Sequence, residues 1–411
     1  MNTTLATLKE RGFFAQCSDE AALSRLMDEG PVSFYVGIDP TGDSLHIGHL
    51  VPLYAMVHLA RDGHRPVALV GGGTARIGDP SGKTEARRIL SVEQINANVA
   101  AIEMQIRAFL STADVDARFV NNADWLAELN YIDFLRDIGR HFSVNRMLSF
   151  ETYRMRLETG LSFIEFNYQL LQSYDFLELY RRHDVRLQIG GDDQWGNIVA
   201  GVDLTRRVVG ADVYGLTFPL VTRADGKKMG KTEDGAVFLD PRRVSAYEMF
   251  QYWRNVPDAD VGKFLLTYTF LPTDECKRLG SLPGERINEA KETLALEATA
   301  LIHGREAATA SLEAAKSAFA GSGGAGGADA IPSIEVPASE LAAGINAVDL
   351  FHRTSLCSSR SDARRLIDQG GAWVNDRKVD DVDQTISTDW VVDGAMVLRA
   401  GKKRYFRVIV A

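Results

Sequence analysis

Cysteine is scarce in this chain, and long apolar segments are missing. The 411 residues include three cysteines, Cys17, Cys276 and Cys357, which lie far apart in the sequence. These cysteines lack the paired spacing of a zinc site or a disulfide framework, so we expect free thiols and no metal site built from protein ligands. No run approaches the roughly 18 apolar residues that cross a bilayer, and residues 1–12 lack the apolar stretch of a signal peptide. We therefore expect a cytoplasmic protein without a membrane partner.

Positive charge is in deficit, but not evenly along the chain. The net charge of −9 argues against a protein that coats nucleic acid along its whole length. Residues 346–411 hold 11 Lys or Arg and 9 Asp, so this end carries +2 while the remainder carries −11. Such an end is compatible with phosphate contacts, although a solvated surface has the same composition.

The distribution of apolar residues indicates several domains, as the length suggests. Short apolar runs at 32–38 and 67–70 precede Gly-rich turns, and residues 91–110 and 162–180 repeat apolar positions at helical spacing. This alternation is typical of an α/β fold with buried parallel strands, here a Rossmann-like domain. Helical periodicity follows, then a Gly/Ala-rich linker, then a small α+β module with two short helices and short strands. The expected boundaries are 1–220 for the α/β domain, 221–320 for the helical domain, 321–345 for the linker and 346–411 for the last module.

The segment from Tyr35 to His49 holds the first candidate site, with the sequence Tyr-Val-Gly-Ile-Asp-Pro-Thr-Gly-Asp-Ser-Leu-His-Ile-Gly-His. A strand ends at a Pro-Gly turn, and Asp43 or Ser44 is placed to cap the helix that follows. His46 and His49 are three residues apart, so both imidazoles face one side of the first turn and converge with the helix dipole on an anion. Gly48 leaves room for a flat group such as a nucleotide base. The alternative is two surface or capping histidines.

A second candidate site is the basic segment 223–232, which reads Arg-Ala-Asp-Gly-Lys-Lys-Met-Gly-Lys-Thr. Taken alone it is typical of a solvated surface turn. Together with the histidine segment it predicts a phosphate clamp, since lysines on a loop stabilise charge that develops when a phosphate is attacked. Residues 78–84 resemble a P-loop, but three residues separate the glycines where that motif needs four, so we reject a P-loop nucleotide site.

These two segments resemble the two signature motifs of class I aminoacyl-tRNA synthetases. The histidine motif matches fully. The basic segment departs from the Lys-Met-Ser-Lys-Ser form of the family, because it reads Lys228-Met-Gly-Lys231-Thr232, but both lysines keep their positions.

A third group of candidates lies on one predicted helix. Tyr168, Gln172 and Asp175 are spaced by four and then three, which places a phenol, an amide and a carboxylate on one helix face. A polar helix surface is the alternative, but the neighbouring residues are too apolar and aromatic to be mostly exposed. Buried Tyr35 and Asp175 would each need a hydrogen-bonding partner, since unpaired burial costs about 1 to 3 kcal/mol. A substrate phenol supplies that partner, whereas phenylalanine does not, a form of discrimination for which the tyrosyl enzymes are themselves the standard example.

With residues 188–197, Gln-Ile-Gly-Gly-Asp-Asp-Gln-Trp-Gly-Asn, the chain resembles the bacterial type of tyrosyl-tRNA synthetase over essentially its whole length. The resemblance implies the following tyrosine-binding residues: Tyr35 and Asp175 for the phenol, Asp79, Tyr168 and Gln172 for the α-ammonium, and Gln188 and Gln194 along the amino-acid side. For ATP it implies the binding residues Gly37, Asp39, Gly48, Gly191, Asp193 and Lys231. Of these, Gly191 and Asp193 would bind the ribose, with His49 near it, and Thr41 and His46 would meet the γ-phosphate. For pyrophosphate it implies Lys83, Arg87, Lys228 and Lys231, and Thr232 belongs to the same catalytic loop.

The resemblance also implies the reaction and its partners. The carboxylate of L-tyrosine attacks the α-phosphorus of ATP, and the adenylate then acylates the terminal adenosine of the tRNA for tyrosine. Mg²⁺ would accompany ATP without a dedicated protein cage. The family further implies a homodimer, with the helical domain and the last module on the anticodon side and long arm of tRNA.

The last module resembles the RNA-binding domain first seen in the fourth protein of the small ribosomal subunit. Its basic residues recur on helical turns before a Gly-Gly turn, and a solvated helix face is the alternative. The candidates for phosphate contacts are Arg360, Arg364, Arg365, Lys378, Lys402 and Lys403.

Two other functions compete with this interpretation. A tryptophanyl synthetase shares both signature motifs but has no reason to place Tyr35 and Asp175 in its pocket. A non-catalytic RNA-binding protein with a synthetase fold would be expected to lose some of the histidines and lysines, which are all present here.

Overall fold

The computed structural model describes residues 2–81, 90–222, 224, 229, 231–232, 235–319, 331–354, 356–392, 394–401 and 404–411. Their backbone forms two compact units. The first contains Met1–Lys231, Ala236–Asp240 and Pro257–Pro283, and the second contains Thr232–Gly235, Pro241–Val256 and Gly284–Ala411.

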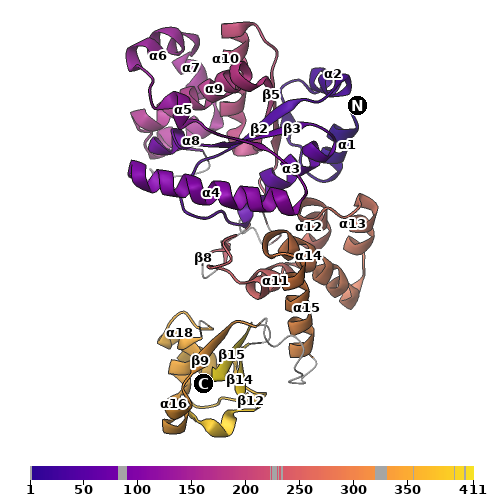
Figure 1. The fold of residues 1–411 in the computed structure, drawn as a ribbon, viewed down its shortest axis with the longest axis vertical. Helices are drawn as coiled ribbons and strands as arrows, with labels where there is room; N and C mark the ends of the chain where they lie inside the picture. The colour runs from indigo at the N-terminus through magenta and orange to yellow at the C-terminus, as the bar shows by residue number, and fades with distance from the viewer. Residues whose placement is uncertain are drawn as a thin grey trace. The chain divides into compact units, whose positions relative to one another are not determined.

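A six-stranded sheet forms the centre of the first unit (Figure 1). Its strands are β1 (Gln16–Cys17), β2 (Ser33–Ile38), β3 (Arg65–Val70), β4 (Arg118–Asn121), β5 (Val185–Gly191) and β6 (Tyr214–Phe218), in the order β1-β6-β5-β2-β3-β4. The strands from β2 to β6 are parallel, and only β1 is antiparallel. The sheet confirms the predicted Rossmann-like fold. Because β2 lies between β3 and β5, the strand order switches beside it, and ligands bind at such switch points outside the carboxyl ends of the strands.

Helices surround this sheet on both faces (Figure 1). The helices that precede or connect its strands are α1 (Thr3–Glu10), α2 (Glu20–Glu29), α3 (Leu50–Arg61), α4 (Val92–Thr112), α5 (Ala123–Leu126), α6 (Tyr131–Asp137), α7 (Val144–Ser149), α8 (Glu151–Thr159), α9 (Phe163–His183) and α10 (Trp195–Val209). The two helices predicted from periodicity are α4 and α9. Each begins with a capping box, Ser91 with Gln94 and Ser162 with Glu165, which explains why the apolar repeat starts where it does.

Two helices of the predicted helical domain belong instead to the first unit. They are α12 (Val261–Tyr268) and α13 (Thr273–Gly280). The buried guanidinium of Arg11 donates hydrogen bonds to the carbonyl oxygens of Leu266 at 3.1 Å, Thr269 at 3.0 Å and Leu271. The Tyr54 hydroxyl donates to the Tyr268 carbonyl at 2.6 Å. These contacts attach the end of α12 to the N-terminal helices, so the expected single helical domain over 221–320 is not what the structure shows.

The remaining helices of that segment, α11 (Ala246–Arg254), α14 (Ile287–His303) and α15 (Arg305–Phe319), pack against one another in the second unit. The module at the C-terminus has its own apolar core. Its helices are α16 (Ala338–Ala343), α17 (Ala347–Arg353) and α18 (Arg360–Asp368), beside a five-stranded sheet in the order β12-β11-β14-β15-β9. The strands of this sheet are β9 (Ser333–Val336), β11 (Ala372–Val374), β12 (Arg377–Lys378), β14 (Ala395–Ala400) and β15 (Arg404–Val410), and β10 (Ile345–Asn346) pairs separately with β13 (Thr385–Ile386).

The start of this module corrects the expected boundary at residue 346. Strand β9 pairs in parallel with β15, and Val336, Leu341 and Ile345 are buried in the core of the module. Residues 333–345 are therefore folded parts of the module, although they lay within the expected linker. The alternating apolar residues Ile334 and Val336 explain why β9 joins the module, since they face its core while Ser333 and Glu335 do not.

The three cysteines are free thiols, as predicted. In the described part of the chain, no helix is both long and apolar enough to span a bilayer.

Candidate active site

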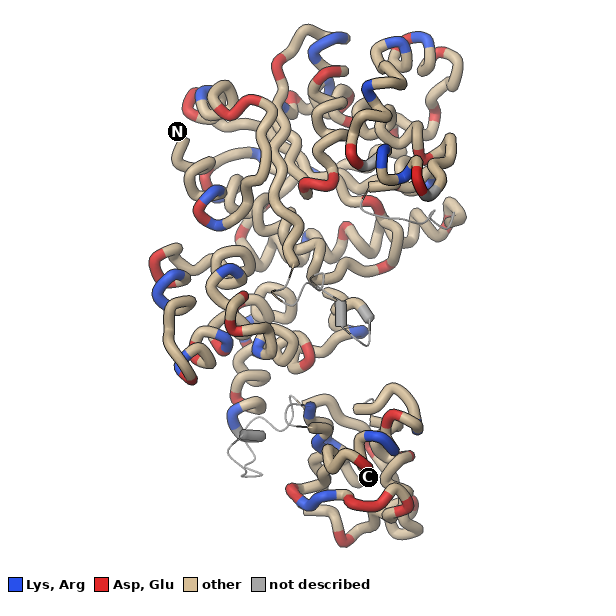
Figure 2. Tube along the Cα trace, turned by 180° about the vertical axis from the view of Figure 1, so that it is seen from behind, with Lys and Arg blue, Asp and Glu red and all other residues tan. Residues whose placement is uncertain are grey.

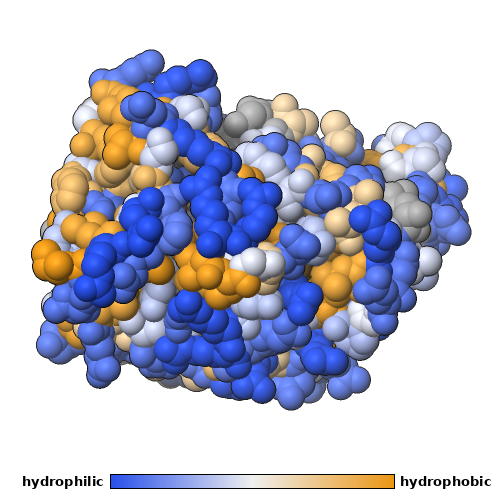
Figure 3. All heavy atoms as spheres, turned by 90° about the horizontal axis from the view of Figure 1, so that it is seen from above, coloured by the Kyte–Doolittle hydropathy of each residue, from blue (hydrophilic) through white to orange (hydrophobic). Residues whose placement is uncertain are grey.

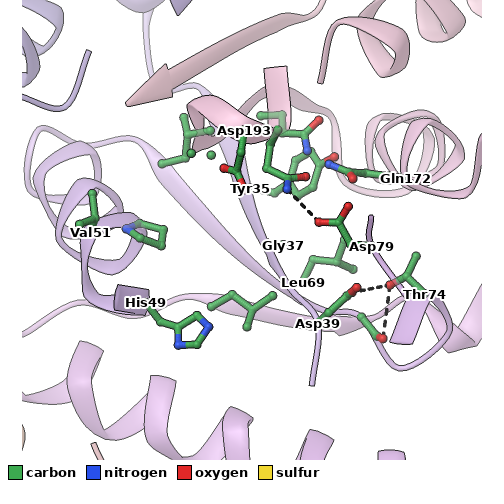
Figure 4. A pocket seen from close by; sticks show the side chains of 18 of the residues that line it. Tyr35, Gly37, Asp39, His49, Val51, Leu69, Thr74, Asp79, Gln172 and Asp193 are labelled. Atoms are coloured by element: carbon green, nitrogen blue, oxygen red, sulfur yellow. Dashed lines mark hydrogen bonds between the residues drawn. The ribbon is translucent and has the colours of Figure 1, made fainter. Parts of the chain in front are cut away.

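A cavity of about 310 Å³ opens at the carboxyl ends of β2, β3 and β5, within the first unit (Figure 4). In Figure 4, His49 and Val51 lie at one end, and Asp79, Thr74 and Gln172 lie at the other. Most of the site residues expected from the sequence line this one cavity: Tyr35, Gly37, Asp39, Thr41, Gly48, His49, Asp79, Tyr168, Gln172, Asp175, Gln188, Gly191, Asp193 and Gln194. Residues that are far apart in sequence thus meet at the switch point of the sheet.

Asp175 and Tyr35 form the most buried end of the cavity, each about 1% exposed. Asn122 Nδ2 donates to Asp175 Oδ2 at 2.9 Å, and Trp125 Nε1 donates to Asp175 Oδ1 at 2.8 Å. Asp175 therefore has two protein donors even without a substrate phenol. The Tyr35 hydroxyl lacks a hydrogen-bond partner among the described residues.

Burial changes the acidity of both groups. Burial raises the pKa of Asp175 to about 8, against the opposing effect of the hydrogen bonds from Asn122 and Trp125. Burial, followed by the charge of Asp175, raises the pKa of Tyr35 well above its ordinary value. Tyr35 is therefore a neutral hydroxyl beside a carboxyl group, and a third hydroxyl placed between them would satisfy both.

A chain of hydrogen bonds connects this end to Asp39. Asn122 Nδ2 also donates to Thr74 Oγ1 at 2.9 Å, and Thr74 Oγ1 donates to Asp39 Oδ1 at 2.7 Å. The Tyr168 hydroxyl donates to Asp39 Oδ2 at 2.8 Å. Burial, then the charge of Asp39, raises the pKa of Tyr168 well above its ordinary value. Asp39 thus fixes the orientation of the Tyr168 ring as well as lining the cavity.

Asp79 lies in a second polar cluster, together with the amides of α9 and α10. Gln194 Nε2 donates to Asp79 Oδ2 at 2.9 Å, and the backbone N–H of Ser81 donates to Asp79 Oδ1 at 2.9 Å. Asn197 Nδ2 donates to Gln172 Oε1 at 2.9 Å. The cluster places a carboxylate and amide oxygens at one wall of the cavity, which is an arrangement that accepts hydrogen bonds from an ammonium group.

At the end of the cavity near β5, the Asp193 side chain lies close to the backbone of Gly191. A Cβ added at Gly191 would lie 2.6 Å from Asp193 Oδ1, so any larger residue there would displace the Asp193 side chain. Burial, then the charge of Asp79, raises the pKa of Asp193. Gln188 is buried, and its Oε1 has no hydrogen-bond partner in the described ranges.

The two histidines cap a short 3-10 turn, η1 (Ile47–His49), that leads into α3. His46 Nδ1 accepts from the Gly48 N–H at 3.0 Å, His49 Nδ1 accepts from the His46 N–H at 3.1 Å, and the ring centres are 4.0 Å apart. The predicted caps were wrong, because the Ser44 hydroxyl instead donates to the Leu45 carbonyl. A Cβ at Gly48 would lie 2.8 Å from the His46 ring, so glycine also makes room for that cap. His46 does not line the cavity, whereas His49, whose ring packs on it, does.

Several cationic candidates, Lys83, Arg87 and Lys228, lie outside the described residues. Only the backbone of Lys231 and Thr232 is described, as strand β7 (Lys231–Thr232). The chain on both sides of these lysines is held by described contacts within the first unit. The Ala224 N–H donates to the buried Asp260 at 2.7 Å, and the Ile47 N–H donates to the Val237 carbonyl at 3.0 Å. Ala224 and Val237, described residues on either side of Lys228 and Lys231, are therefore both held in the first unit, and Val237 lies beside the histidine turn.

The basic candidates of the last module are exposed on α18 and β12. Arg360 pairs with Asp349 at 2.8 Å, Arg365 pairs with Asp362 at 2.8 Å, and Lys378 pairs with Asp380 at 2.7 Å. Arg364 is also exposed, and Lys402 and Lys403 lie outside the described residues. In the part of the chain that the structure describes, no group of three or more His, Cys, Asp or Glu is placed to hold a metal ion.

Four polar residues of the site were not predicted from the sequence: Thr74, Asn122, Trp125 and Asn197. Asn122 follows the end of β4, just as Asp39 follows β2 and Gly71 follows β3. Polar residues directly after parallel strands meet at one edge of a sheet, so this position could have been found once β4 was recognised.

Two family models match the chain. The model for class I tRNA synthetases specific for tryptophan and tyrosine matches residues 27–320, and the model for the SYY-like C-terminal domain of tyrosine–tRNA ligase matches residues 325–408. The tyrosine–tRNA ligase of Treponema denticola is 58% identical over 410 residues and covers 100% of both chains. That of Treponema pallidum is 56% identical over 410 residues, covering 100% of this chain and 99% of its own.

Solved structures agree with these sequence relatives. A C-terminally truncated mitochondrial tyrosyl-tRNA synthetase from Aspergillus nidulans has a TM-score of 0.68 and 28% identity, covering 76% of this chain and 93% of its own. The corresponding enzyme from Coccidioides posadasii has a TM-score of 0.66 and 31% identity, covering 76% and 91%. The match to the C-terminal domain of tyrosine–tRNA ligase and the high identity to two tyrosine–tRNA ligases exclude the tryptophanyl synthetase alternative. The chain therefore belongs to the tyrosyl-tRNA synthetase family of class I enzymes, and it activates tyrosine with ATP and transfers it to tRNA.

Proposed function

We propose that the cavity binds tyrosine with its phenol between Tyr35 and Asp175. The observation that carries this assignment is the buried Tyr35 hydroxyl, which lacks a partner among the described residues and lies beside a carboxyl group. The substrate hydroxyl would donate to Asp175 and accept from Tyr35, which satisfies all three groups. Asn122 and Trp125 keep the Asp175 carboxylate in place for this contact.

The other end of tyrosine would reach the second polar cluster. Asp79, Tyr168 and Gln172 offer a carboxylate and polar oxygens to the α-ammonium group, and Gln188 and Gln194 line the path between the two ends. This leaves the tyrosine carboxylate free to face ATP. Holding the two substrates in this geometry is a large part of the catalysis, because no enzyme nucleophile is required.

ATP would occupy the part of the cavity near the histidine turn and the end of β5. We assign Gly37, Asp39, Gly48, Gly191 and Asp193 to the nucleoside, His49 to the ribose, and Thr41 and His46 to the γ-phosphate. A tyrosine carboxylate oxygen bonds to the α-phosphorus while the bond to pyrophosphate breaks. The developing negative charge would be stabilised by Lys83, Arg87, Lys228 and Lys231, with Thr232 on the same segment.

Mg²⁺ would enter with ATP. It is a hard cation that keeps water ligands and binds through substrate phosphates more often than through an all-protein cage. Its chemistry in the site would be to neutralise phosphate charge. We place the reaction in the cytoplasm, where the tRNA substrate of translation is charged.

ATP–pyrophosphate exchange without tRNA tests the assignment of the cavity. The exchange should run with tyrosine and not with phenylalanine or tryptophan at equal concentration, because only a phenol satisfies Tyr35 and Asp175. Exchange with phenylalanine at a similar kcat/KM would contradict the phenol site while leaving the ATP half of the assignment intact.

Tyr35→Phe should reduce the discrimination between tyrosine and phenylalanine by roughly tenfold, since one hydrogen bond to the substrate contributes about 1 to 1.5 kcal/mol. The measurement is the ratio of kcat/KM values for the two amino acids in the exchange assay, with KM for ATP expected to stay unchanged. Tyr214→Phe, at the start of β6 and away from the cavity, is the matched control. An unchanged ratio for Tyr35→Phe would remove Tyr35 from the phenol site.

We also propose a homodimer. Large apolar side chains are exposed on the helices from α6 to α9, and Figure 3 shows apolar residues gathering on the side where Figure 1 places α6 to α8. These residues are Tyr131, Ile132, Leu135, Val144, Met155, Leu157, Phe163 and Ile164. Large apolar side chains exposed in such number on neighbouring helices mark a protein–protein contact.

The double variant Ile132→Asp and Phe163→Asp should shift the protein towards the monomer, because both side chains are 69% exposed and their charges would be buried in a dimer. Sedimentation velocity at a fixed protein concentration measures the change. Met104→Asp, an exposed apolar position on α4, is the control. A wild-type protein that sediments as a monomer would contradict the proposal.

For tRNA, we propose that the last module contacts phosphates through Arg360, Arg364, Arg365, Lys378, Lys402 and Lys403. The support is their exposure where described and the match to the C-terminal domain of tyrosine–tRNA ligases. Such contacts position tRNA without reading its sequence. In this division of labour, residues 1–220 form the catalytic domain and the helical segment contacts the anticodon side.

A further inference from the structure

The five-stranded sheet of the C-terminal module has one face that its helices do not cover. Along β14 and β15, Met396, Leu398 and Val408 are buried in the core, where Ala363 and Ile367 of α18 also lie. Successive side chains of a strand point to opposite faces, so the residues between these positions face away from α18. The sheet therefore separates this second face from the arginines of α18.

Four side chains form a row across this second face. The register places Lys378 of β12 opposite Trp373 of β11, Trp373 opposite Arg399 of β14, and Arg399 opposite Tyr405 of β15. Directly opposite residues of neighbouring strands share a face, so the row alternates cation and aromatic ring. Arg407 stands two residues further along β15, opposite Val397, and adds a third cation to the same face.

Contacts within the row leave binding capacity for a ligand. The Arg399 guanidinium lies 4.6 Å from the centre of the Trp373 ring, and its Nε is buried without a hydrogen-bond partner among the described residues. Trp373 and Tyr405 are only partly buried, and the Lys378 side chain is 42% exposed. Glu335 of β9 lies on the same face, three strands away from Trp373, in register with Ile409.

Aromatic rings interleaved with cations are the chemistry that binds unpaired nucleotides. Bases stack on aromatic side chains and on arginine planes, and cations beside them meet the phosphates. A purely apolar protein partner would leave the buried Arg399 Nε without a hydrogen-bond acceptor. We propose that this row, Lys378, Trp373, Arg399 and Tyr405 with Arg407 beside it, is a stacking surface for unpaired nucleotides of tRNA, separate from the α18 arginines.

The inference rests on the proposed contact between this module and tRNA, but it names different residues, and of these only Lys378 belongs to the phosphate contacts proposed above. The test uses the full-length chain and the unmodified transcript of the tRNA for tyrosine, with fluorescence anisotropy as the readout of Kd. Trp373→Leu and Tyr405→Leu should each weaken binding by roughly tenfold, the effect of losing one stacked base. ATP–pyrophosphate exchange without tRNA should stay at the wild-type rate in both.

Salt dependence separates stacking from charge. The slope of log Kd against log salt should be unchanged in Trp373→Leu and should fall in Arg407→Met, because only the second variant loses a cation. Trp390→Leu is the matched control. Like Trp373, Trp390 has an arginine near its ring, Arg377 at 5.7 Å, but it packs against the apolar core of the module and is not part of the row. This variant should leave Kd unchanged.

Ultraviolet cross-linking of the wild-type complex gives a second readout that needs no variant. Cross-linked nucleotides should be found on peptides that contain Trp373 or Tyr405. If Arg364→Ser and Arg365→Ser weaken tRNA binding while Trp373→Leu, Tyr405→Leu and the cross-links show no effect, the stacking surface is refuted and the α18 contacts stand. If neither set changes Kd, both proposals fail.

Discussion

Asp175→Asn should lower kcat/KM for tyrosine by roughly 100-fold in ATP–pyrophosphate exchange, with a much smaller change in KM for ATP. Asp175 offers one oxygen to Asn122 and the other to Trp125, so it satisfies two N–H donors at once. An asparagine offers one oxygen and one NH₂ group, and that NH₂ would face a donor in a buried site. The lost hydrogen bond to the phenol and the unsatisfied buried donor together cost about 3 kcal/mol, which corresponds to roughly 100-fold.

The control for this variant lies one turn along the same helix. Glu178 is a buried carboxylate of α9 that pairs with Arg181 at 3.0 Å and Arg182 at 2.9 Å and does not line the cavity. Glu178→Gln should therefore leave KM for tyrosine unchanged. If Asp175→Asn kept a wild-type KM and kcat for tyrosine, the phenol would have to bind elsewhere in the cavity.

The parts of this site that depend on local spacing could be predicted from the sequence. Tyr168, Gln172 and Asp175 share one face because helix geometry alone fixes the positions at i, i+4 and i+7. The strand, turn and helix around the histidines are also local, since each element begins within a few residues of the preceding one. Only the caps of the turn were misjudged, because the histidine rings themselves accept the free N–H groups.

The parts that depend on sheet order could not be predicted in this way. Asn122 and Trp125 reach Asp175 only because β4 lies beside β3, and the four residues of β4 show no clear apolar alternation. Arg11 holds the end of α12 from about 255 residues away in sequence. Such contacts depend on which buried polar groups come together in the folded chain. The periodicity of apolar residues in the sequence does not report these long-range contacts.

The boundary of the last module illustrates the same limit. Strand β9 has four residues and pairs with β15, about 70 positions later in the chain. A Gly/Ala-rich stretch precedes β9 directly, so composition extends the linker into it. The pairing is parallel and non-local, and it becomes visible only when β15 is in place beside it.

Deletion of residues 320–411 should leave ATP–pyrophosphate exchange close to the wild-type rate and lower kcat/KM for tRNA in aminoacylation by at least roughly 100-fold. Every described residue that lines the cavity lies between Tyr35 and Val221, and the last module has an apolar core of its own, so the deletion removes none of these lining residues. Binding that relies on several phosphate contacts loses orders of magnitude in affinity when they are removed.

The two assays on this truncated chain decide how the work is divided between the two ends of the molecule. A loss confined to aminoacylation assigns the last module to tRNA, and the loss should shrink as salt is lowered, because the remaining cations then bind tRNA phosphates more strongly. Equal losses in both assays would instead mean that the catalytic cavity needs the module for its own structure. In that case the separate core of the module would not reflect a separate function, and the proposed division would be wrong.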